Sequence, residues 1–159
     1  MTDGSRDDET TIGYTPRGSN IVEKLNEYAR DHKFIAELGA TVDSYEDGTV
    51  RMSVPYNEKF KNPGMGGPVH GGVLLSVLDT VMGFTLMATA GEDGRTSTGP
   101  TISLTTNFLT ASSEPLEAVG ELVRMGQSTA VIDGTLIGRE SGERIATAQG
   151  VWRVYRERE

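Results

Sequence analysis

The stretch Asn62 to Ala90, NPGMGGPVHGGVLLSVLDTVMGFTLMATA, decides the fold of this chain. Glycine and proline crowd its front, and the apolar run behind them carries a single carboxylate, Asp79, nine residues after His70. Apolar residues on nearly every side predict a buried helix over residues 71–90. That length would also suit a membrane span, but Asp79 would then lie near the bilayer centre, where a charge is costly. We therefore expect the core helix of a folded domain.

The segments around this helix alternate apolar and polar residues with the period of β-strands. A hairpin is predicted over residues 40–57, with its turn at residues 46–48. Four more strands are predicted after the helix, at residues 101–109, 116–125, 128–138 and 144–155. Residues 20–38 have helical spacing, with a break near His32 as an option and Gly39 as the stop. The layout is α+β, with one antiparallel sheet of about six strands around one dominant helix.

The composition excludes several classes of protein. The 159 residues suffice for one domain with a single core. The net charge of −8 argues against nucleic acid as a partner, because phosphate binding needs a cationic surface. The chain has no cysteine and only two histidines, so a disulfide, a thiol nucleophile or a cysteine-ligated metal is excluded and a histidine-rich site is disfavoured. We expect no metal and no redox cofactor.

The first 19 residues, MTDGSRDDETTIGYTPRGS, are polar and acidic and offer few groups that could drive packing. They lack the basic start and apolar core of a signal peptide. We therefore expect a flexible acidic tail over residues 1–19, a single domain over residues 20–159, and a cytoplasmic location. The acidic, lysine-poor composition fits a salt-rich cytoplasm or ordinary solubility equally well.

Small and polar side chains form one stripe along the predicted helix, at Gly72, Ser76, Asp79, Thr80 and Gly83. Such a stripe suits either a helix–helix contact or a bound ligand. A desolvated carboxylate without a cation partner is costly, and its raised pKa is a feature enriched at active sites. No lysine or arginine lies within one helical turn of Asp79 in the sequence. This absence favours a functional role for the carboxylate.

The sequence His70-Gly71-Gly72 stands where the helix is expected to begin. Free N–H groups and the positive dipole end at that point could polarise a carbonyl oxygen, although a simple cap and loop-to-helix joint would look the same. Gly72 and Asp79 are separated by about 10 Å along the helix axis. One chain cannot easily bring both to one reacting group, whereas two antiparallel helices across a two-fold axis could. A catalytic interpretation therefore requires a dimer.

The segment NPGMGGPVHGGVLLSVLDTVMGF, followed by TISLTTNFL, resembles the hotdog-fold acyl-CoA thioesterases of the phenylacetic-acid-degradation (PaaI-like) type. The resemblance covers about residues 38–155. It implies the hotdog fold, in which an antiparallel sheet wraps around one long central helix. It also implies that Asp79 is the general base or nucleophile, and that the amide of Gly71, with Gly72 beside it, polarises the thioester carbonyl.

The same resemblance implies three supporting residues: His70 would help to form the carbonyl pocket, Asn62 would contribute to carbonyl binding, and Thr101 would hold the attacking water. The implied reaction is hydrolysis of a short-chain or aromatic acyl-CoA by a homodimer or a dimer of dimers. Coenzyme A is then part of the substrate, and no cofactor is needed. We expect neither nucleic acid nor a membrane as a partner.

Several other functions compete with hydrolysis. A non-catalytic acyl-CoA-binding module could use the same fold for sensing, although no DNA-binding segment accompanies it here. A hydratase or dehydratase acting on acyl chains normally pairs a histidine with an acid, whereas Asp79 stands alone on its helix. A structural scaffold would leave Asp79 unexplained. Serine hydrolase chemistry is disfavoured because the sequence has no G-x-S-x-G motif.

Overall fold

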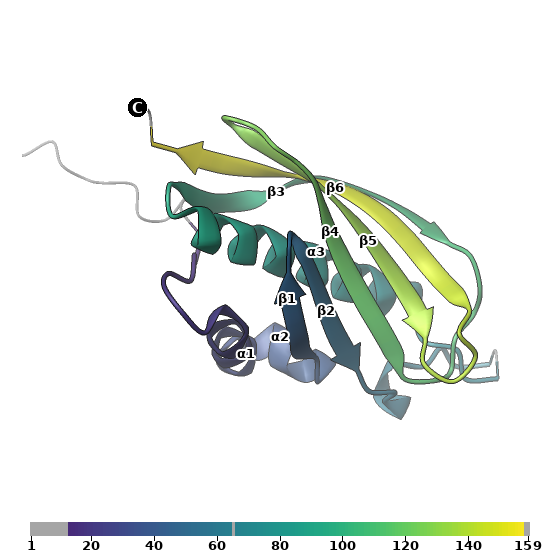
Figure 1. Cartoon of the computed structure of the whole chain (residues 1–159). Helices are drawn as coiled ribbons and strands as arrows, with labels where there is room; N and C mark the ends of the chain where they lie inside the picture. Colours follow the sequence, from purple (N-terminus) through teal and green to yellow (C-terminus); the bar gives the residue numbers. More distant parts are fainter. Residues whose placement is uncertain (1–12, 65, 158–159) are drawn as a thin grey trace, which may run out of the picture.

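A computed structural model describes residues 13–64 and 66–157 of the chain. In chain order the elements are α1 (Ile21–Asp31), α2 (Lys33–Leu38), β1 (Thr41–Glu46), β2 (Thr49–Val54), the 3-10 turn η1 (Glu58–Phe60), α3 (Gly71–Asp93), β3 (Thr96–Phe108), β4 (Leu116–Met125), β5 (Thr129–Gly138) and β6 (Arg144–Arg156). The strands form one antiparallel sheet in the order β1-β2-β4-β5-β6-β3. The sheet curves around α3, and α1 lies against β1 and α3 while α2 lies against α1 and α3 (Figure 1). This confirms the predicted α+β hotdog architecture.

The central helix is the core of the molecule. Among the described residues, α3 is the helix long and apolar enough to cross a bilayer, yet 61% of its most apolar stretch is buried inside this fold. Two strand glycines let the sheet approach it closely. A Cβ at Gly120 would lie 2.8 Å from the carbonyl oxygen of Val81, and one at Gly134 would lie 3.0 Å from Met82. Glycine is needed at Gly120 because the helix backbone occupies that space, whereas a larger residue at Gly134 would require the side chain of Met82 to shift.

The predicted N-terminal helix is divided at His32. This residue has an extended backbone, with φ −84° and ψ 108°, and so ends α1. Its Nδ1 accepts a hydrogen bond of 3.3 Å from the backbone N–H of Ile35, which caps the start of α2. Gly39 then ends α2 at a φ of 68°, a conformation that glycine adopts without strain. The break anticipated near His32 is therefore present.

The strand that follows α3 begins five residues earlier than its predicted start at Thr101, because β3 extends back to Thr96. Gly99 and Pro100, which precede the predicted start, belong to β3, an edge strand whose register with β6 shifts between Thr98 and Thr101. A proline is tolerated at such an irregularity because its missing N–H breaks no regular ladder bond. The predicted start of this strand was therefore wrong.

Residues 13–19, which the sequence pattern assigns to the tail, lie along the end of α3 and the start of β3. The backbone N–H of Gly13 donates to the carbonyl of Thr98 over 2.6 Å. The guanidinium of Arg17 donates to the carbonyls of Ala90 and Thr96, each over 2.8 Å. The remainder of the predicted tail, residues 1–12, lies outside the described residues.

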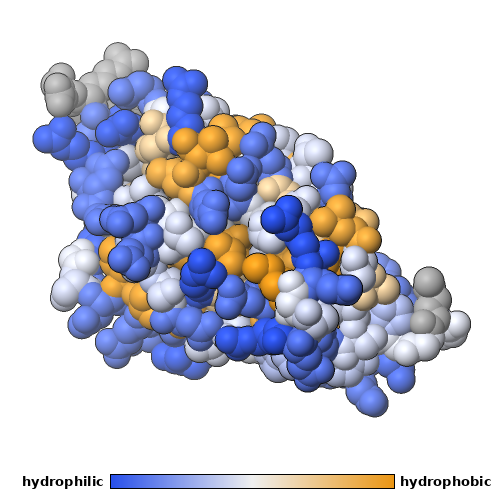
Figure 2. Space-filling model, turned by 45° about the vertical axis from the view of Figure 1, so that its right-hand side comes forward, coloured by the Kyte–Doolittle hydropathy of each residue, from blue (hydrophilic) through white to orange (hydrophobic). Residues whose placement is uncertain are grey.

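The surface is mostly polar. Figure 2 shows that hydrophobic residues on the viewed face form separate patches with hydrophilic residues between them. Three large apolar side chains on or just after β3 are more than half exposed: Ile102 at 55%, Phe108 at 55% and Leu109 at 52%. They mark the β3 edge of the sheet as an unusually apolar part of the surface.

Candidate active site

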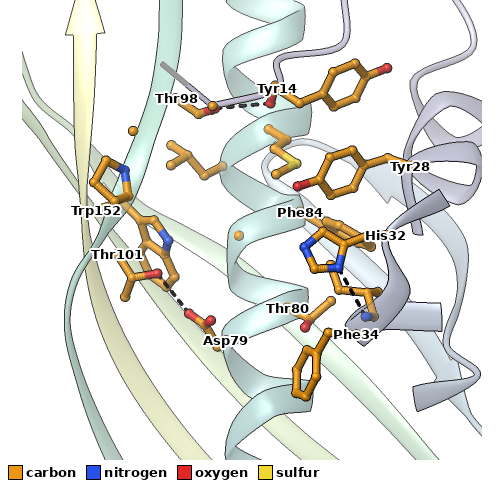
Figure 3. Close-up of a pocket in the computed structure, with 17 residues that line it drawn as sticks. Tyr14, Tyr28, His32, Phe34, Asp79, Thr80, Phe84, Thr98, Thr101 and Trp152 are labelled. Atoms are coloured by element: carbon orange, nitrogen blue, oxygen red, sulfur yellow. Dashed lines mark hydrogen bonds between the residues drawn. The ribbon is translucent and has the colours of Figure 1, made fainter. Parts of the chain in front are cut away.

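A cavity of about 400 Å³ opens along one side of α3. Its walls come from α3 between Asp79 and Met87, from the start of β3, from the junction of α1 with α2, and from Trp152 on β6 (Figure 3). Within the described part of the chain, no lysine or arginine lines this cavity. In the same part, no three histidine, aspartate or glutamate side chains gather closely enough to hold a metal ion. The cavity therefore suits an organic group without a large charge.

Gly83 leaves the middle of the helical wall open. A Cβ at this position would meet no atom within 4 Å. The wall from Asp79 to Met87 spans about 12 Å along the helix axis, which is about two turns. Of the stripe predicted from the sequence, Asp79, Thr80 and Gly83 line the cavity. The other two members lie beyond it, where the hydroxyl of Ser76 donates to the carbonyl of Gly72 over 2.8 Å.

Asp79 is partly buried and faces the cavity (Figure 3). Its Oδ1 accepts a hydrogen bond of 3.0 Å from the hydroxyl of Thr101 on β3. Burial raises the pKa of the Asp79 carboxyl above its ordinary value, and the hydrogen bond from Thr101 opposes that rise. No ion pair joins Asp79 to any cation of the described residues. The site is therefore a carboxylate in weakly solvating surroundings, held by one hydroxyl.

The start of α3 forms a second cluster of polar groups. The Nδ1 of His70 accepts a hydrogen bond of 2.8 Å from the N–H of Gly72, so this amide already has a partner. The N–H of Gly71 makes no hydrogen bond within the described part of the chain. Because helix starts leave such donors free, Gly71 presents the amide that a ligand could use.

The loop before α3 explains how His70 is positioned. Three of its glycines, Gly64, Gly66 and Gly67, have φ values of 82°, 74° and 100°, a region that favours glycine. The two ends of the loop are tied together, because the N–H of His70 donates to the carbonyl of Phe60 over 2.8 Å. The glycine-rich sequence therefore allows the chain to turn back and begin α3 at a fixed place.

The structure separates the site residues predicted from the sequence into two groups. Thr101 lies beside Asp79, whereas His70, Gly71 and Gly72 lie at the start of the helix and do not line the cavity. Asn62 belongs to the loop beside them; its backbone N–H donates to the carbonyl of Pro68 over 2.8 Å. Its side chain makes no hydrogen bond with the rest of the described chain. Because α3 is unbroken, about 12 Å along its axis separates Gly71 from Asp79.

Sequence reasoning missed the opposite wall of the cavity, which includes Tyr14, Tyr28 and His32. Tyr28 lies in the last turn of α1 and His32 is its C-cap, and the backbone N–H of His32 donates to the carbonyl of Tyr28 over 3.0 Å, which places the two side chains near each other. The ring of Tyr28 meets Phe84 of α3 edge-on, with centroids 6.1 Å apart, and stacks on Tyr14 at 5.0 Å. The four-residue spacing of Tyr28 and His32 can be read from the sequence. The packing of α1 against α3, which places both residues at the cavity, cannot.

Comparison with known proteins identifies the family. The sequence profile of the thioesterase superfamily matches residues 66–145, which are 80 of the 159 residues and include α3, β3, β4 and β5. The chain belongs to the thioesterase superfamily. This membership indicates a thioesterase or esterase-type hydrolase family.

Individual relatives agree with this membership. A protein of Halobacterium salinarum named "Putative esterase VNG_1336C" is 28% identical over 139 residues, which cover 84% of this chain and 91% of that protein. Thioesterase HI1161 of Haemophilus influenzae matches with a TM-score of 0.76 at 15% identity, over 92% of this chain and 98% of that one. The E. coli PaaI protein from the phenylacetic acid degradation operon matches with a TM-score of 0.69 at 19% identity, over 87% and 97%. At these identities the two structures show a shared fold alone.

Proposed function

We propose that this protein is a PaaI-like acyl-CoA thioesterase that hydrolyses the thioester of a short-chain or aromatic acyl-CoA. The observation that carries the proposal is the position of Asp79, a partly buried carboxylate without an ion-pair partner in the described chain, at the side of a cavity of about 400 Å³. Carboxylates in such surroundings are common at active sites. Membership of the thioesterase superfamily supplies the reaction class.

The chemistry of Asp79 follows from its surroundings. A raised pKa makes a carboxylate a stronger base, so Asp79 can take a proton from water as the water attacks the thioester carbon. The C–S bond of the tetrahedral intermediate then breaks, and coenzyme A leaves as a thiol that takes up the proton from Asp79. The hydroxyl of Thr101 donates to Asp79, and its oxygen lone pairs stay free to accept a hydrogen bond from that water. In the other open route Asp79 attacks the thioester carbon directly, the C–S bond breaks to release coenzyme A, and water then hydrolyses the mixed anhydride.

The thioester carbonyl needs a donor where negative charge develops in the transition state. The N–H of Gly71 fits this role because it has no partner in the described chain and lies at the positive end of α3. The amide of Gly72 is engaged by His70, so His70 acts in this proposal by shaping the helix start. Asn62 would assist carbonyl binding from the adjacent loop.

We propose that the complete site forms in a homodimer, alone or within a dimer of dimers. Gly71 and Asp79 of one chain are too far apart to meet at one carbonyl group. The apolar edge made by β3, with Ile102, Phe108 and Leu109 exposed, would be a liability unless a partner covered it. A Cβ at Gly71 would lie 3.5 Å from the Phe108 ring, so this edge adjoins the helix start. Pairing of β3 with the partner's β3 would therefore bring each helix start toward the other chain.

The direct test is turnover of a panel of acyl-CoA thioesters with different chain lengths and ring-bearing acyl groups. We expect Asp79→Asn to lower kcat by about 10²- to 10⁴-fold on the best substrate. The matched control is Asp133→Asn, because Asp133 accepts a hydrogen bond of 2.9 Å from Gln149 and does not line the cavity. Near wild-type turnover by a folded Asp79→Asn variant would show that the assignment is wrong.

A non-catalytic acyl-CoA-binding module is the second candidate. This candidate is favoured if the chain stays monomeric. A monomer has the cavity, but its Gly71 and Asp79 are too far apart to act on one carbonyl group. Tight binding across the acyl-CoA panel with no hydrolysis would support this candidate over the thioesterase.

A further inference from the structure

Two polar groups in the cavity have no role in the chemistry described above. The hydroxyl of Tyr28 points toward α3 and makes no hydrogen bond within the described part of the chain (Figure 3). The Nδ1 of His32 accepts from the N–H of Ile35, which places the proton of a neutral ring on Nε2. That second nitrogen also points toward α3 (Figure 3). With ring centroids 5.7 Å apart, the two side chains present their polar ends as a pair.

The position of this pair along α3 sets its distance from the reacting carbonyl. Tyr28 contacts Phe84, which follows Asp79 by five residues, or about 7.5 Å along the helix axis. An extended chain advances about 1.2 Å per bond, so this distance corresponds to about six bonds. An acyl group that runs along this wall from a carbonyl carbon beside Asp79 would therefore bring its far end to the level of Tyr28, beside which His32 lies.

The chemistry of the pair selects a neutral partner. A carboxylate at the far end would be desolvated beside aromatic rings, and no lysine or arginine of the described chain lines the cavity to pair with it. A hydroxyl or carbonyl oxygen can accept from Nε2 of His32 and from the hydroxyl of Tyr28. Burial raises the pKa of Tyr28 above its ordinary value, which keeps that hydroxyl protonated and neutral.

We propose that Tyr28 and His32 are specificity-determining residues that select acyl groups with a neutral oxygen about six bonds from the thioester carbon. The oxygen can be a hydroxyl or a carbonyl, carried on a chain or on a single ring. This inference rests on the proposed thioesterase function and adds the feature of the acyl group that the cavity recognises. Apolar acyl groups of the same length give the half-buried hydroxyl of Tyr28 no partner, whereas the exposed Nε2 of His32 stays hydrated, so these groups react less well.

The test compares three six-carbon CoA thioesters, namely hexanoyl-CoA, 6-hydroxyhexanoyl-CoA and the dicarboxylic adipoyl-CoA. We expect the wild-type protein to have its highest kcat/KM with the hydroxyl compound. Tyr28→Phe should lower the hydroxyl-to-hexanoyl ratio by about fivefold, the value of one neutral hydrogen bond. His32→Asn should act in the same direction, because asparagine can still cap α2 while the Nε2 donor is lost. Tyr45→Phe is the matched control, because the hydroxyl of Tyr45 donates to Glu92 outside the cavity.

The outcomes separate this inference from the proposed function. No wild-type preference for the hydroxyl compound, a preference for adipoyl-CoA, or a ratio unchanged in both variants would overturn the specificity role. If no thioester is hydrolysed, the proposed function fails, and calorimetric Kd values for the same three compounds still test the inference. In that case 6-hydroxyhexanoyl-CoA should bind most tightly. Tyr28→Phe should lower the ratio of its affinity to that of hexanoyl-CoA about fivefold. Melting curves establish that each variant is folded.

Discussion

The hydroxyl of Thr101 donates a hydrogen bond of 3.0 Å to Oδ1 of Asp79, and this contact joins β3 to the middle of α3. The bond opposes the effect of burial on the pKa of the carboxyl. It also holds the carboxylate in one orientation toward the cavity. Both consequences can be measured.

Replacing Thr101 with valine keeps the shape of the side chain and removes the hydroxyl. The pKa of Asp79 should rise further, because the group that lowers it is gone. The acid limb of the kcat/KM profile should therefore move to higher pH, and kcat should fall about tenfold through the loss of one hydrogen bond in the site. Thr101→Ser keeps the donor and is the control. If the acid limb of Thr101→Val stays at the same pH as in the wild type, the ionisation of Asp79 does not cause the pH dependence of kcat/KM.

The raised pKa of Asp79 also predicts how stability depends on pH. Below the ordinary pKa of the carboxyl, folded and unfolded chains are both protonated, so burial of the group has little cost. As the pH rises toward the raised folded pKa, the unfolded chain releases its proton first and the folded state loses stability. The loss is complete above the folded pKa.

Asp79→Asn should therefore be more stable than the wild type at neutral pH, and the difference should vanish toward about pH 4. Urea denaturation midpoints measured from about pH 4 to about pH 8 test this relation. A difference that grows on acidification would mean that folding lowers the pKa of Asp79. Asp133→Asn serves again as the control.

Two glycines in α3 should respond in opposite ways to alanine. Gly83→Ala should stabilise the protein by up to about 1 kcal/mol, because a methyl group meets open space and alanine favours the helix. Gly91→Ala should destabilise it, because a Cβ there would lie 2.1 Å from the carbonyl oxygen of Pro16. Chemical denaturation of both variants gives the comparison.

The larger substitution Gly83→Leu should fill the cavity between Asp79 and Met87. We expect a folded variant whose KM rises most for the longest acyl groups, with acetyl-CoA the least affected. If acyl chains of all lengths were affected equally, the acyl group would not extend along this wall.

How well the sequence predicted the fold depended on how sharply each element is bounded. β4 has its predicted bounds, because Pro115 and Gly126 stand directly outside it. The prediction began β3 at Thr101 and so cut it short, because the edge strand continues back through Pro100 to Thr96. The alternation of apolar and polar residues indicates a strand. Whether a proline ends that strand depends on whether it lies at the edge or in the middle of the sheet, which the sequence does not show.

The candidate site also contains residues that could be found from the sequence and residues that could not. Asp79 could be found from the sequence because a charge inside an apolar helix is conspicuous, and the structure places Thr101 beside it. Tyr28 and His32 could not be found, because their helix reaches the cavity through packing between segments distant in the chain. Their roles, like those of the residues at the start of α3, are predictions that activity measurements must test.

The proposed shared site can be tested with two variants that are each inactive. Gly71→Pro removes the amide donor, and proline is favoured at the first position of a helix. His70 already has the extended backbone that precedes proline well, with φ −58° and ψ 135°. We therefore expect Gly71→Pro to fold normally and to lose turnover.

Mixing Gly71→Pro with Asp79→Asn, after unfolding and refolding together, should restore activity. In a mixed dimer, one of the two sites combines an intact Asp79 with an intact Gly71 of the other chain. Random pairing of equal amounts of the two variants makes half of the dimers mixed, so turnover should recover to about a quarter of the wild-type value. If both groups act within one chain, every mixture stays inactive. Sedimentation of the mixture verifies that dimers have formed, so an inactive mixture of dimers would refute the shared site.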